Sequence, residues 1–487
     1  MKMESSFKDT LNIIENGVCN NFLRTDNPLK SSTTVSQSSQ NDGKEGIVCS
    51  VVRQNPCEES KDTQEVSLKD LLDTTPSSED DSSSKNTDVH EEVLKRCKQF
   101  EETSKSYLFE YEKSLPKFTT SEVFVGDLLG KGGYANVYEI KSFRLCDDDD
   151  ESIDVDQHES RNHLKAHTCS REKRNFSYAV KFLRKDVMKK NMLYQLAAVD
   201  IALEAKLLCS LFHPNIIQLR GFCNDKLECS YYSLILDRLH EGLEQRIIKW
   251  KKQETSNSNN TKNGLQWNIF SENDHIPRYK LNILFDITSA LQYIHEMNIV
   301  YRDIKPTNFG FDGEGTIKLF DFGLSKDLSS SQKLKDGTYN LTRAIGSQRY
   351  MAPEVYKGEP YNTSADIYSF SIMLWEILTM KKPYDGFNDQ QHAKLVFYGT
   401  YRPDITTNSI PKLLGSVLES GWSSDLHKRP NFETIQKVLS DLISLSQVQS
   451  NPQINNFDFE SLIMKVFAVI VAAIATVIFG STPIQFI

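Results

Sequence analysis

Two kinds of hydrophobic pattern follow one another in the middle of the chain. The first consists of short apolar runs rich in β-branched and aromatic residues, which predicts strands. These runs are FVGDLLG (124–130), NVYEIKSF (136–143), SYAVKFL (177–183) and YSLILDRL (232–239). The second has apolar residues at helical spacing, around residues 200–211, 279–297 and 365–380, and predicts helices. Strands followed by helices predict an α+β domain of two lobes, which we place at residues 119–447.

Two polar segments interrupt this domain. Residues 146–174 separate two strand-like runs and residues 251–276 separate two helical stretches, and both have the composition of surface loops outside the core. The first contains His158, His163 and His167 beside an acidic run, which allows either a metal site or a solvated charged loop. The solvated loop is the preferred interpretation, because no rigid element is predicted to hold the three imidazoles.

The N-terminal region, residues 1–118, is expected to be largely disordered. Residues 1–88 are dominated by Ser, Thr, Asn, Asp and Glu, so they have little apolar surface to offset the entropy cost of ordering. Four apolar residues between 66 and 72 fit one stripe of a short helix, either docked on a partner or transient and unpartnered; the second is preferred. Residues 91–113 approximate helical spacing and predict an amphipathic helix leading into the folded domain.

The chain ends in an apolar segment. After a polar linker at residues 448–461, residues 466–479 carry no charge, and with the flanking residues the stretch reaches about the 20 residues that a bilayer core requires. A buried core helix is the alternative, but the stretch is apolar all round and no further domain follows to bury it. We therefore predict a single-pass transmembrane tail anchor at residues 462–487. Lys465 lies at its border and no Lys or Arg follows, so the preceding domain is expected to face the cytosol.

Composition narrows the class of protein. The 487 residues carry a formal net charge of −9 and 25% of them are charged, which fits a globular protein without a general attraction to nucleic-acid phosphates. Nucleic acid is therefore not expected as a partner. The nine cysteines form no CxxC pair and no zinc-like spacing, and the N-terminus has no signal-peptide pattern. We expect reduced thiols in the cytosol.

A glycine-rich motif ends the first strand-like run. Its sequence is Gly130-Lys131-Gly132-Gly133-Tyr134-Ala135-Asn136-Val137, with Ala135 in the place of a third glycine. Glycines let a backbone approach phosphate oxygens closely, although such a run also serves as an ordinary hairpin turn. Support comes from Lys181, which follows Tyr178-Ala179-Val180 in a strand-like run, and from Glu204 on the next predicted helix, which is placed to pair with it. A P-loop protein is disfavoured, because no GKS or GKT follows the glycines.

Three further motifs follow in a fixed order. They are Tyr301-Arg302-Asp303-Ile304-Lys305-Pro306-Thr307-Asn308, Phe320-Asp321-Phe322-Gly323 and Met351-Ala352-Pro353-Glu354. With the glycine motif and the strand lysine, residues 122–445 resemble the eukaryotic protein kinases. The DIKPTN and GSQRYMAPE segments resemble serine/threonine kinases, and WEIL, PYDGF and GWSSDLHKRPNF resemble the tyrosine-kinase-like group. The runs LILDRL and NFGFD are similar to kinases of diatoms and related algae.

The resemblance implies transfer of the γ-phosphoryl group of ATP to Ser or Thr hydroxyls of protein substrates, with Mg²⁺ as cofactor. Asp303 would be the base and Lys305 would neutralise the γ-phosphate. Lys181, held by Glu204, would bind the α and β phosphates. The implied metal ligands are Asn308 and Asp321. The implied ATP-binding residues are Leu129, Gly130, Lys131, Gly132, Gly133, Ala135, Val137, Ala179, Lys181, the gatekeeper Leu236, and the hinge residues Asp237 and Leu239.

The resemblance also implies regulation and internal bracing. Phosphorylation is expected between Asp321 and Glu354, where Arg302 would bind the added phosphate. The candidate acceptors are Thr338, Tyr339 and Thr342, with Thr342 preferred. Ser347 replaces the threonine that contacts the base in the family, and Gly310 replaces a larger apolar residue below the adenine. The implied bracing groups are Asp366, which anchors the regulatory column, and the Glu354–Arg429 ion pair.

One rival from another functional class is a catalytically inactive kinase fold that acts as a membrane-tethered scaffold. Such a protein is expected to lack at least one of the strand lysine, the base and the two metal ligands. All four are present in register in this chain. The active enzyme is therefore the preferred interpretation.

Overall fold

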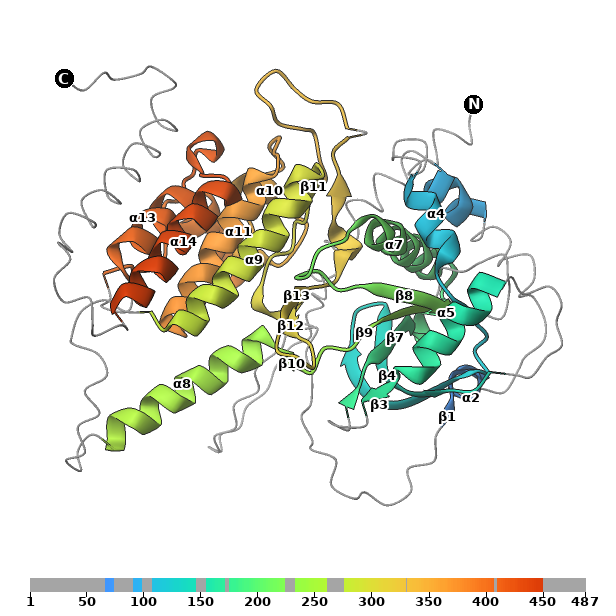
Figure 1. Ribbon diagram of the computed structural model, residues 1–487. Coiled ribbons are helices and arrows are strands. Elements are labelled where there is room, and N and C mark those ends of the chain that lie inside the picture. Colours follow the sequence, from blue (N-terminus) through green and yellow to red (C-terminus); the bar gives the residue numbers. More distant parts are fainter. Residues whose placement is uncertain are drawn as a thin grey trace, which may run out of the picture.

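The computed structural model describes most of the chain between Val66 and Gln449. The described residues are 66–73, 91–98, 107–145, 155–170, 175–223, 233–260, 276–329, 331–406 and 410–449. They form a β-sheet lobe and a helical lobe on either side of a cleft (Figure 1). The predicted two-lobed α+β fold is confirmed.

The smaller lobe is built on a seven-stranded sheet with the strand order β1-β3-β4-β7-β9-β8-β2. Its strands are β1 (Val66–Ser67), β2 (Lys117–Phe118), β3 (Val123–Lys131), β4 (Ala135–Phe143), β7 (Tyr178–Leu183), β8 (Leu219–Cys223) and β9 (Ser233–Asp237). Neighbouring strands are antiparallel except β2 and β8, which are parallel. The four predicted strands correspond to β3, β4, β7 and β9. A short hairpin of β5 (Cys169–Ser170) and β6 (Asn175–Phe176) lies beside this sheet.

The two faces of the sheet have different coverings. Along β7, Val180 and Phe182 are buried with Leu68 of α2 (Leu68–Asp73) and Leu164 of α5 (Val155–Ala166) in one apolar cluster. The alternate residues of β7 face the opposite way, as the two-residue period of a strand requires. On that side, α7 (Asn191–Ser210) covers the sheet and the cleft begins. A short helix, α6 (Lys185–Met188), connects β7 to α7.

The larger lobe is mostly helical. Its helices are α8 (Leu243–Asn260), α9 (Arg278–Glu296), α10 (Pro353–Lys357), α11 (Ser364–Thr379), α12 (Asp389–His392), α13 (Lys412–Gly421) and α14 (Phe432–Gln449). Its short strands are β10 (Glu241–Gly242), β12 (Phe309–Phe311) and β13 (Ile317–Leu319), which form one sheet, and the pair β11 (Ile299–Val300) and β14 (Lys326–Asp327). Helix α11 is buried from Ala365 to Thr379, because it is apolar on all sides and packs in the centre of this lobe.

The two insertions predicted as surface loops, residues 146–174 and 251–276, are partly helical in the structure. Helix α5 occupies part of the 146–174 insertion and packs on the sheet lobe through Leu164 and Arg161, which are 6% and 8% exposed. The prediction that this insertion stays outside the core is therefore wrong for these two side chains. In the second insertion, residues 251–260 continue α8, and residues 261–275 lie outside the described residues. His158, His163 and His167 are exposed, and no cluster of three or more His, Cys, Asp or Glu in the described ranges is arranged to hold a metal.

In the N-terminal region, the preferred interpretation of residues 66–72 as a transient, unpartnered helix is wrong, whereas the disorder predicted for the rest of residues 1–90 stays a prediction. Val66 and Ser67 pair with β3 at the edge of the sheet, and Leu68 is fully buried. The predicted helix 91–113 is found as two helical segments, residues 91–98 and α4 (Tyr107–Ser114), with residues 99–106 outside the described residues. The folded domain therefore begins before residue 119. The rest of residues 1–106 lies outside the described residues.

The predicted membrane anchor cannot be compared with the fold. Within the described ranges, no helix combines the length and the apolarity needed to cross a bilayer. The anchor segment, residues 462–487, and the linker after Gln449 lie outside those ranges.

Candidate active site

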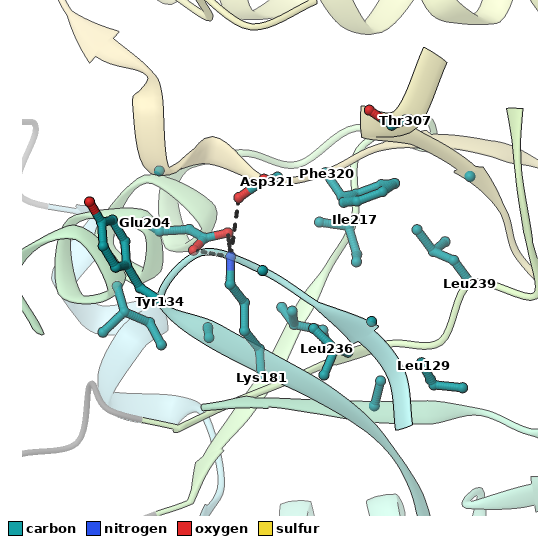
Figure 2. A pocket seen from close by; sticks show the side chains of 18 of the residues that line it. Leu129, Tyr134, Lys181, Glu204, Ile217, Leu236, Leu239, Thr307, Phe320 and Asp321 are labelled. Atoms are coloured by element: carbon teal, nitrogen blue, oxygen red, sulfur yellow. Dashed lines mark hydrogen bonds and ion pairs between the residues drawn. The ribbon is translucent and has the colours of Figure 1, made fainter. Parts of the chain in front are cut away.

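A cavity of about 400 Å³ lies between the two lobes. Leu129 and Leu236 of the sheet lobe lie on one side of it, and Phe320 and Leu239 lie on the other (Figure 2). The predicted ATP-binding residues line it, except Lys131, which is exposed. A largely apolar cavity of this size, with charged groups at Lys181 and Asp321, accepts an aromatic ligand with a polar tail.

Lys181 is held at the polar end of the cavity by two carboxylates. Its Nζ lies 2.6 and 2.9 Å from the Glu204 oxygens and 3.2 Å from Asp321 Oδ1, as Figure 2 shows. Burial disfavours the charged amine, but the two carboxylates outweigh it and raise the pKa of Lys181. The same ammonium lowers the pKa of Asp321. Both groups are therefore ionised at neutral pH, and the ammonium is aimed into the cavity.

The glycine motif forms the β3–β4 turn above this lysine. Cβ atoms added at Gly130 and Gly133 would meet nothing within 4 Å, so the backbone there is open to a ligand. Arg184 holds the turn from below. Its Nη1 donates to the carbonyl oxygens of Gly132 and Gly133 at 3.1 and 3.2 Å, and its backbone N–H donates to the Tyr134 carbonyl at 2.8 Å. The turn is thus fixed by a charged side chain that sequence analysis missed.

Asp303 lies in a dense polar cluster on the loop that leads to Thr307, which lines the cavity. Lys305 Nζ is 2.7 Å from Asp303 Oδ2 and donates to the Ser347 hydroxyl at 2.8 Å. The backbone N–H of Ser347 donates to Asp303 Oδ1 at 2.8 Å, so Ser347 contacts the aspartate through its backbone and the lysine through its hydroxyl. Asn308 donates through Nδ2 to Asp303 Oδ2 at 3.0 Å. A carboxylate fixed in this way can accept a proton from a hydroxyl placed beside it.

Asn308 has one further feature. The side chain is fully buried, yet its Oδ1 has no hydrogen-bond partner. A buried polar oxygen without a partner is costly unless a ligand satisfies it. Together with the ionised Asp321 it offers the hard oxygen donors that suit Mg²⁺.

The loop that carries these groups is anchored from the core of the larger lobe. Asp366, which is fully buried in α11, accepts hydrogen bonds from the backbone N–H groups of Tyr301 and Arg302, both at 2.8 Å. Tyr301 stacks edge-on against Phe322 at 5.4 Å and donates its hydroxyl to the Phe320 carbonyl. These contacts connect the loop of Asp303 to the motif of Asp321.

The floor of the cavity explains the glycine at position 310. A Cβ there would lie 2.9 Å from a methyl carbon of Leu239, so only glycine lets Leu239 lie this close to β12. Leu239 and Phe320 therefore supply the apolar floor that a larger residue at position 310 would otherwise provide. Phe320, Ile217, Tyr134 and Asp200 also line the cavity and were missed. Phe320 and Tyr134 had a sequence signal, because Phe320 lies directly before Asp321 and Tyr134 lies within the glycine motif.

The predicted regulatory residues are separated by burial. Thr338 is 1% exposed and its hydroxyl donates to Asp336 at 2.7 Å, so it is closed to a modifying enzyme in this conformation. Thr342 is half-buried, and its carbonyl accepts from the Tyr361 hydroxyl at 2.9 Å. Arg302 donates through Nε to the Leu324 carbonyl at 2.6 Å. The geometry therefore favours Thr342 over Thr338.

Asp200 gives a prediction about stability. It lies one turn before Glu204 on α7, and burial, followed by the charge of Glu204, raises its pKa to about 7. Between pH about 4 and about 7 the folded chain therefore keeps a proton that the unfolded chain has lost, so stability falls with rising pH by up to about 1.4 kcal/mol per unit. We expect Asp200→Asn to be more stable than the parent at pH 8 and similar to it at pH 4, measured by urea unfolding. The exposed Asp385→Asn is the control; equal pH profiles for the parent and Asp200→Asn would contradict the prediction.

Comparison with known proteins agrees with this geometry. The family model described as the protein kinase domain matches residues 165–440, more than half of the chain. The match begins after the glycine motif, but β3 and β4 are joined to β7 in one sheet, so the motif belongs to the same domain and only the insertion separates it.

Three curated relatives of this chain are protein kinases by name. CTR1 of Arabidopsis thaliana, a serine/threonine-protein kinase, is 36% identical over 34% of this chain and 20% of its own length. HT1 of the same plant, a serine/threonine/tyrosine-protein kinase, is 30% identical over 48% and 53%, respectively. A mitogen-activated protein kinase kinase kinase of Drosophila melanogaster is 28% identical over 52% and 20%. The chain thus spans between a fifth and about half of the length of these relatives.

The relatives belong to the tyrosine-kinase-like group, as the sequence predicted; the likeness to algal kinases stays a prediction. The lysine held by two carboxylates, the braced aspartate loop and the family match agree with one another. The chain therefore belongs to the protein kinase family.

Proposed function

We propose that this chain transfers the γ-phosphoryl group of ATP to Ser or Thr hydroxyls of proteins. The observation that carries the proposal is the position of Lys181, which is paired with both Glu204 and Asp321 in the lining of the cavity. Asp303 lies on the loop that leads to Thr307, another residue of that lining. In the protein kinase family the strand lysine and helix glutamate must be paired, and the metal-binding aspartate in place, for phosphoryl transfer to occur.

The residues of the site have separate roles in the proposed transfer. The glycine turn and Lys181 bind the phosphates, and the apolar slot between Leu129 and Phe320 takes the adenine. Asp303 orients the acceptor hydroxyl and receives its proton, while the ammonium of Lys305 beside it offsets negative charge on the moving phosphoryl group. Closure of the lobes around the cavity would exclude water from the transfer.

Mg²⁺ is the proposed cofactor. Asn308 and Asp321 would hold it, because the first has an unpartnered buried oxygen and the second is kept ionised by Lys181. When bound, the metal neutralises charge on the phosphates and keeps them aligned with the acceptor.

The substrate class and the activity are tested together. The full chain is incubated with MgATP and a mixture of serine, threonine and tyrosine peptides, and the phosphorylated residue is identified by mass spectrometry. We expect phosphoserine or phosphothreonine, because Lys305 lies in a segment that resembles serine/threonine kinases, Ser347 keeps a hydroxyl beside it, and CTR1 has this type by name. Phosphotyrosine alone would contradict the substrate class. No transfer under any condition would favour the inactive scaffold instead.

Arg184 gives a prediction for nucleotide binding. Arg184→Ala removes the two hydrogen bonds that hold the glycine turn, each worth about 0.5–1.5 kcal/mol, so the KM for ATP should rise about fivefold to about 150-fold. The kcat should change little, because Arg184 does not contact the base. The exposed Lys189→Ala, in the adjacent turn, is the control. An unchanged KM for ATP would show that the turn is fixed by other contacts.

We also propose that the chain is anchored in a membrane by residues 462–487 with its kinase domain in the cytosol. Support comes from the uncharged apolar stretch 466–479 and from the absence of Lys and Arg after Lys465. The full chain should stay with cell membranes after carbonate washing, and a chain ending at Asn456 should be released with its kinase activity intact. A shortened chain that still pellets with the washed membranes would refute the anchor.

A further inference from the structure

Helix α7 carries Glu204 and lies between two ion pairs on opposite sides. On one side Glu204 binds Lys181. Two residues later, and about 200° around the helix, Lys206 pairs with Glu112 of α4. The side chain of Lys206 is 5% exposed and that of Glu112 is 14% exposed, so this second pair is shielded from water. A shielded pair of this kind fixes geometry more strongly than a surface pair does.

Apolar contacts reinforce this attachment. Tyr111 of α4 packs edge-on against Phe212, just beyond the end of α7, with ring centroids 4.6 Å apart. Val93 and Cys97 in the helical segment 91–98 are 1% and 3% exposed and belong to the same buried cluster as the apolar residues of α7. Figure 1 shows α4 running beside α7 on the side away from the cleft. The segment before the predicted domain boundary therefore covers the outer side of the helix that carries Glu204.

The insertion helix α5 holds α4 in turn. Gln157 donates through Nε2 to the carbonyl oxygens of Lys113 and Leu115 at 2.9 and 3.1 Å, and its Oε1 accepts from the Lys117 N–H at 3.3 Å. One side chain thus satisfies the last carbonyls of α4 and the start of β2. Helix α5 is itself fixed by the buried ion pair of Arg161 with Glu122.

We propose that the helical segment 91–98, residues 107–118 and α5 form a brace that holds α7 in the position where Glu204 meets Lys181, and that Glu112 and Gln157 are positioning residues for phosphoryl transfer. The proposal rests on the proposed kinase activity. Neither residue lines the cavity, so Glu112 acts through its ion pair with Lys206 of α7, and Gln157 acts through α4. Loosening the brace lets α7 shift, and Lys181 then loses the carboxylate that orients it toward the phosphates.

The test compares four variants of the full chain. Glu112→Ala and Gln157→Ala remove the two contacts, while Lys113→Ala on α4 and Glu159→Ala on α5 change exposed side chains of the same helices. We expect the first two to lower kcat about tenfold with the KM for the peptide unchanged, and to speed amide hydrogen exchange in α7 to a similar extent. The two controls should match the parent in both measurements.

A charge exchange separates positioning from simple loss of stability. Glu112→Lys combined with Lys206→Glu restores the pair in reverse and should recover most of the kcat that Glu112→Ala loses. A lower melting temperature with unchanged kcat below it, or unchanged exchange in α7, would overturn the brace. If the parent chain transfers no phosphate, the proposed function fails, and the exchange of α7 in the same variants still decides whether the brace exists.

Discussion

Asp321→Asn should lower phosphoryl transfer by about a thousandfold or more. The substitution keeps the shape of the side chain but removes a charge that Lys181 holds ionised and that a metal would need. A metal ion supplies several kcal/mol of charge stabilisation, and each 1.36 kcal/mol changes the rate about tenfold. The measurement is the initial rate of peptide phosphorylation at saturating MgATP.

Controls separate lost chemistry from lost structure. Asp385→Asn alters an exposed carboxylate of the larger lobe and should leave the rate unchanged. The melting temperature of Asp321→Asn should stay within a few degrees of the parent, because Asp321 is half-exposed and Glu204 still binds Lys181. Equal initial rates of peptide phosphorylation for Asp321→Asn and the parent would contradict the proposed mechanism.

The residues of the site could be predicted because they lie in short contiguous motifs. Asp303, Lys305 and Asn308 lie within six consecutive positions, 303–308, and the backbone of one loop brings them together. The pairing of Lys181 with Glu204 could be predicted because a strand carrying the lysine is followed along the chain by a helix carrying the glutamate. Contacts of this kind are local in the sequence or follow from the order of strands and helices, and both can be read from the sequence.

The bracing elements could not be predicted in the same way. Helix α5 has a polar sequence, and among its side chains with described burial Leu164 and Arg161 are the buried ones, so no hydrophobic stripe identifies it. Strand β8 contains Arg220 and Gly221, and the latter lies against the Pro116 carbonyl, a contact that exists only in the folded chain. Tertiary contacts, and not the intrinsic secondary-structure propensity of their residues, determine where α5 and β8 form.

The surroundings of the site show the same limit. A glycine at position 310 suggested an incomplete floor, whereas Leu239 fills the space because that position has no side chain. Thr342 was preferred to Thr338 only for its distance from the Met351–Glu354 motif, whereas in the fold Thr338 is buried and Thr342 is half-buried. Accessibility and complementary packing are properties of the fold.

The largest effect on stability is expected at the Glu354–Arg429 ion pair, where Arg429→Met should cost about 3–5 kcal/mol. The two side chains are 5% and 0% exposed, and two hydrogen bonds of 2.6 and 2.9 Å join them. Without the guanidinium, the Glu354 carboxylate stays buried and unpaired, and the carbonyls of Ser364 and Ser423 lose a donor. Urea unfolding of the full chain measures the change.

The adjacent Lys428 provides the control for this prediction. Its side chain is 65% exposed and its distance to Asp425 is 3.9 Å, so Lys428→Met should change stability by less than about 1 kcal/mol. The double variant Glu354→Leu with Arg429→Met removes both charges together and should recover part of the loss, because a buried charge without a partner costs more than the pair contributes. If Arg429→Met and Lys428→Met unfold at the same urea concentration, the buried pair does not hold the helical lobe together, and the contacts of α11 must do so.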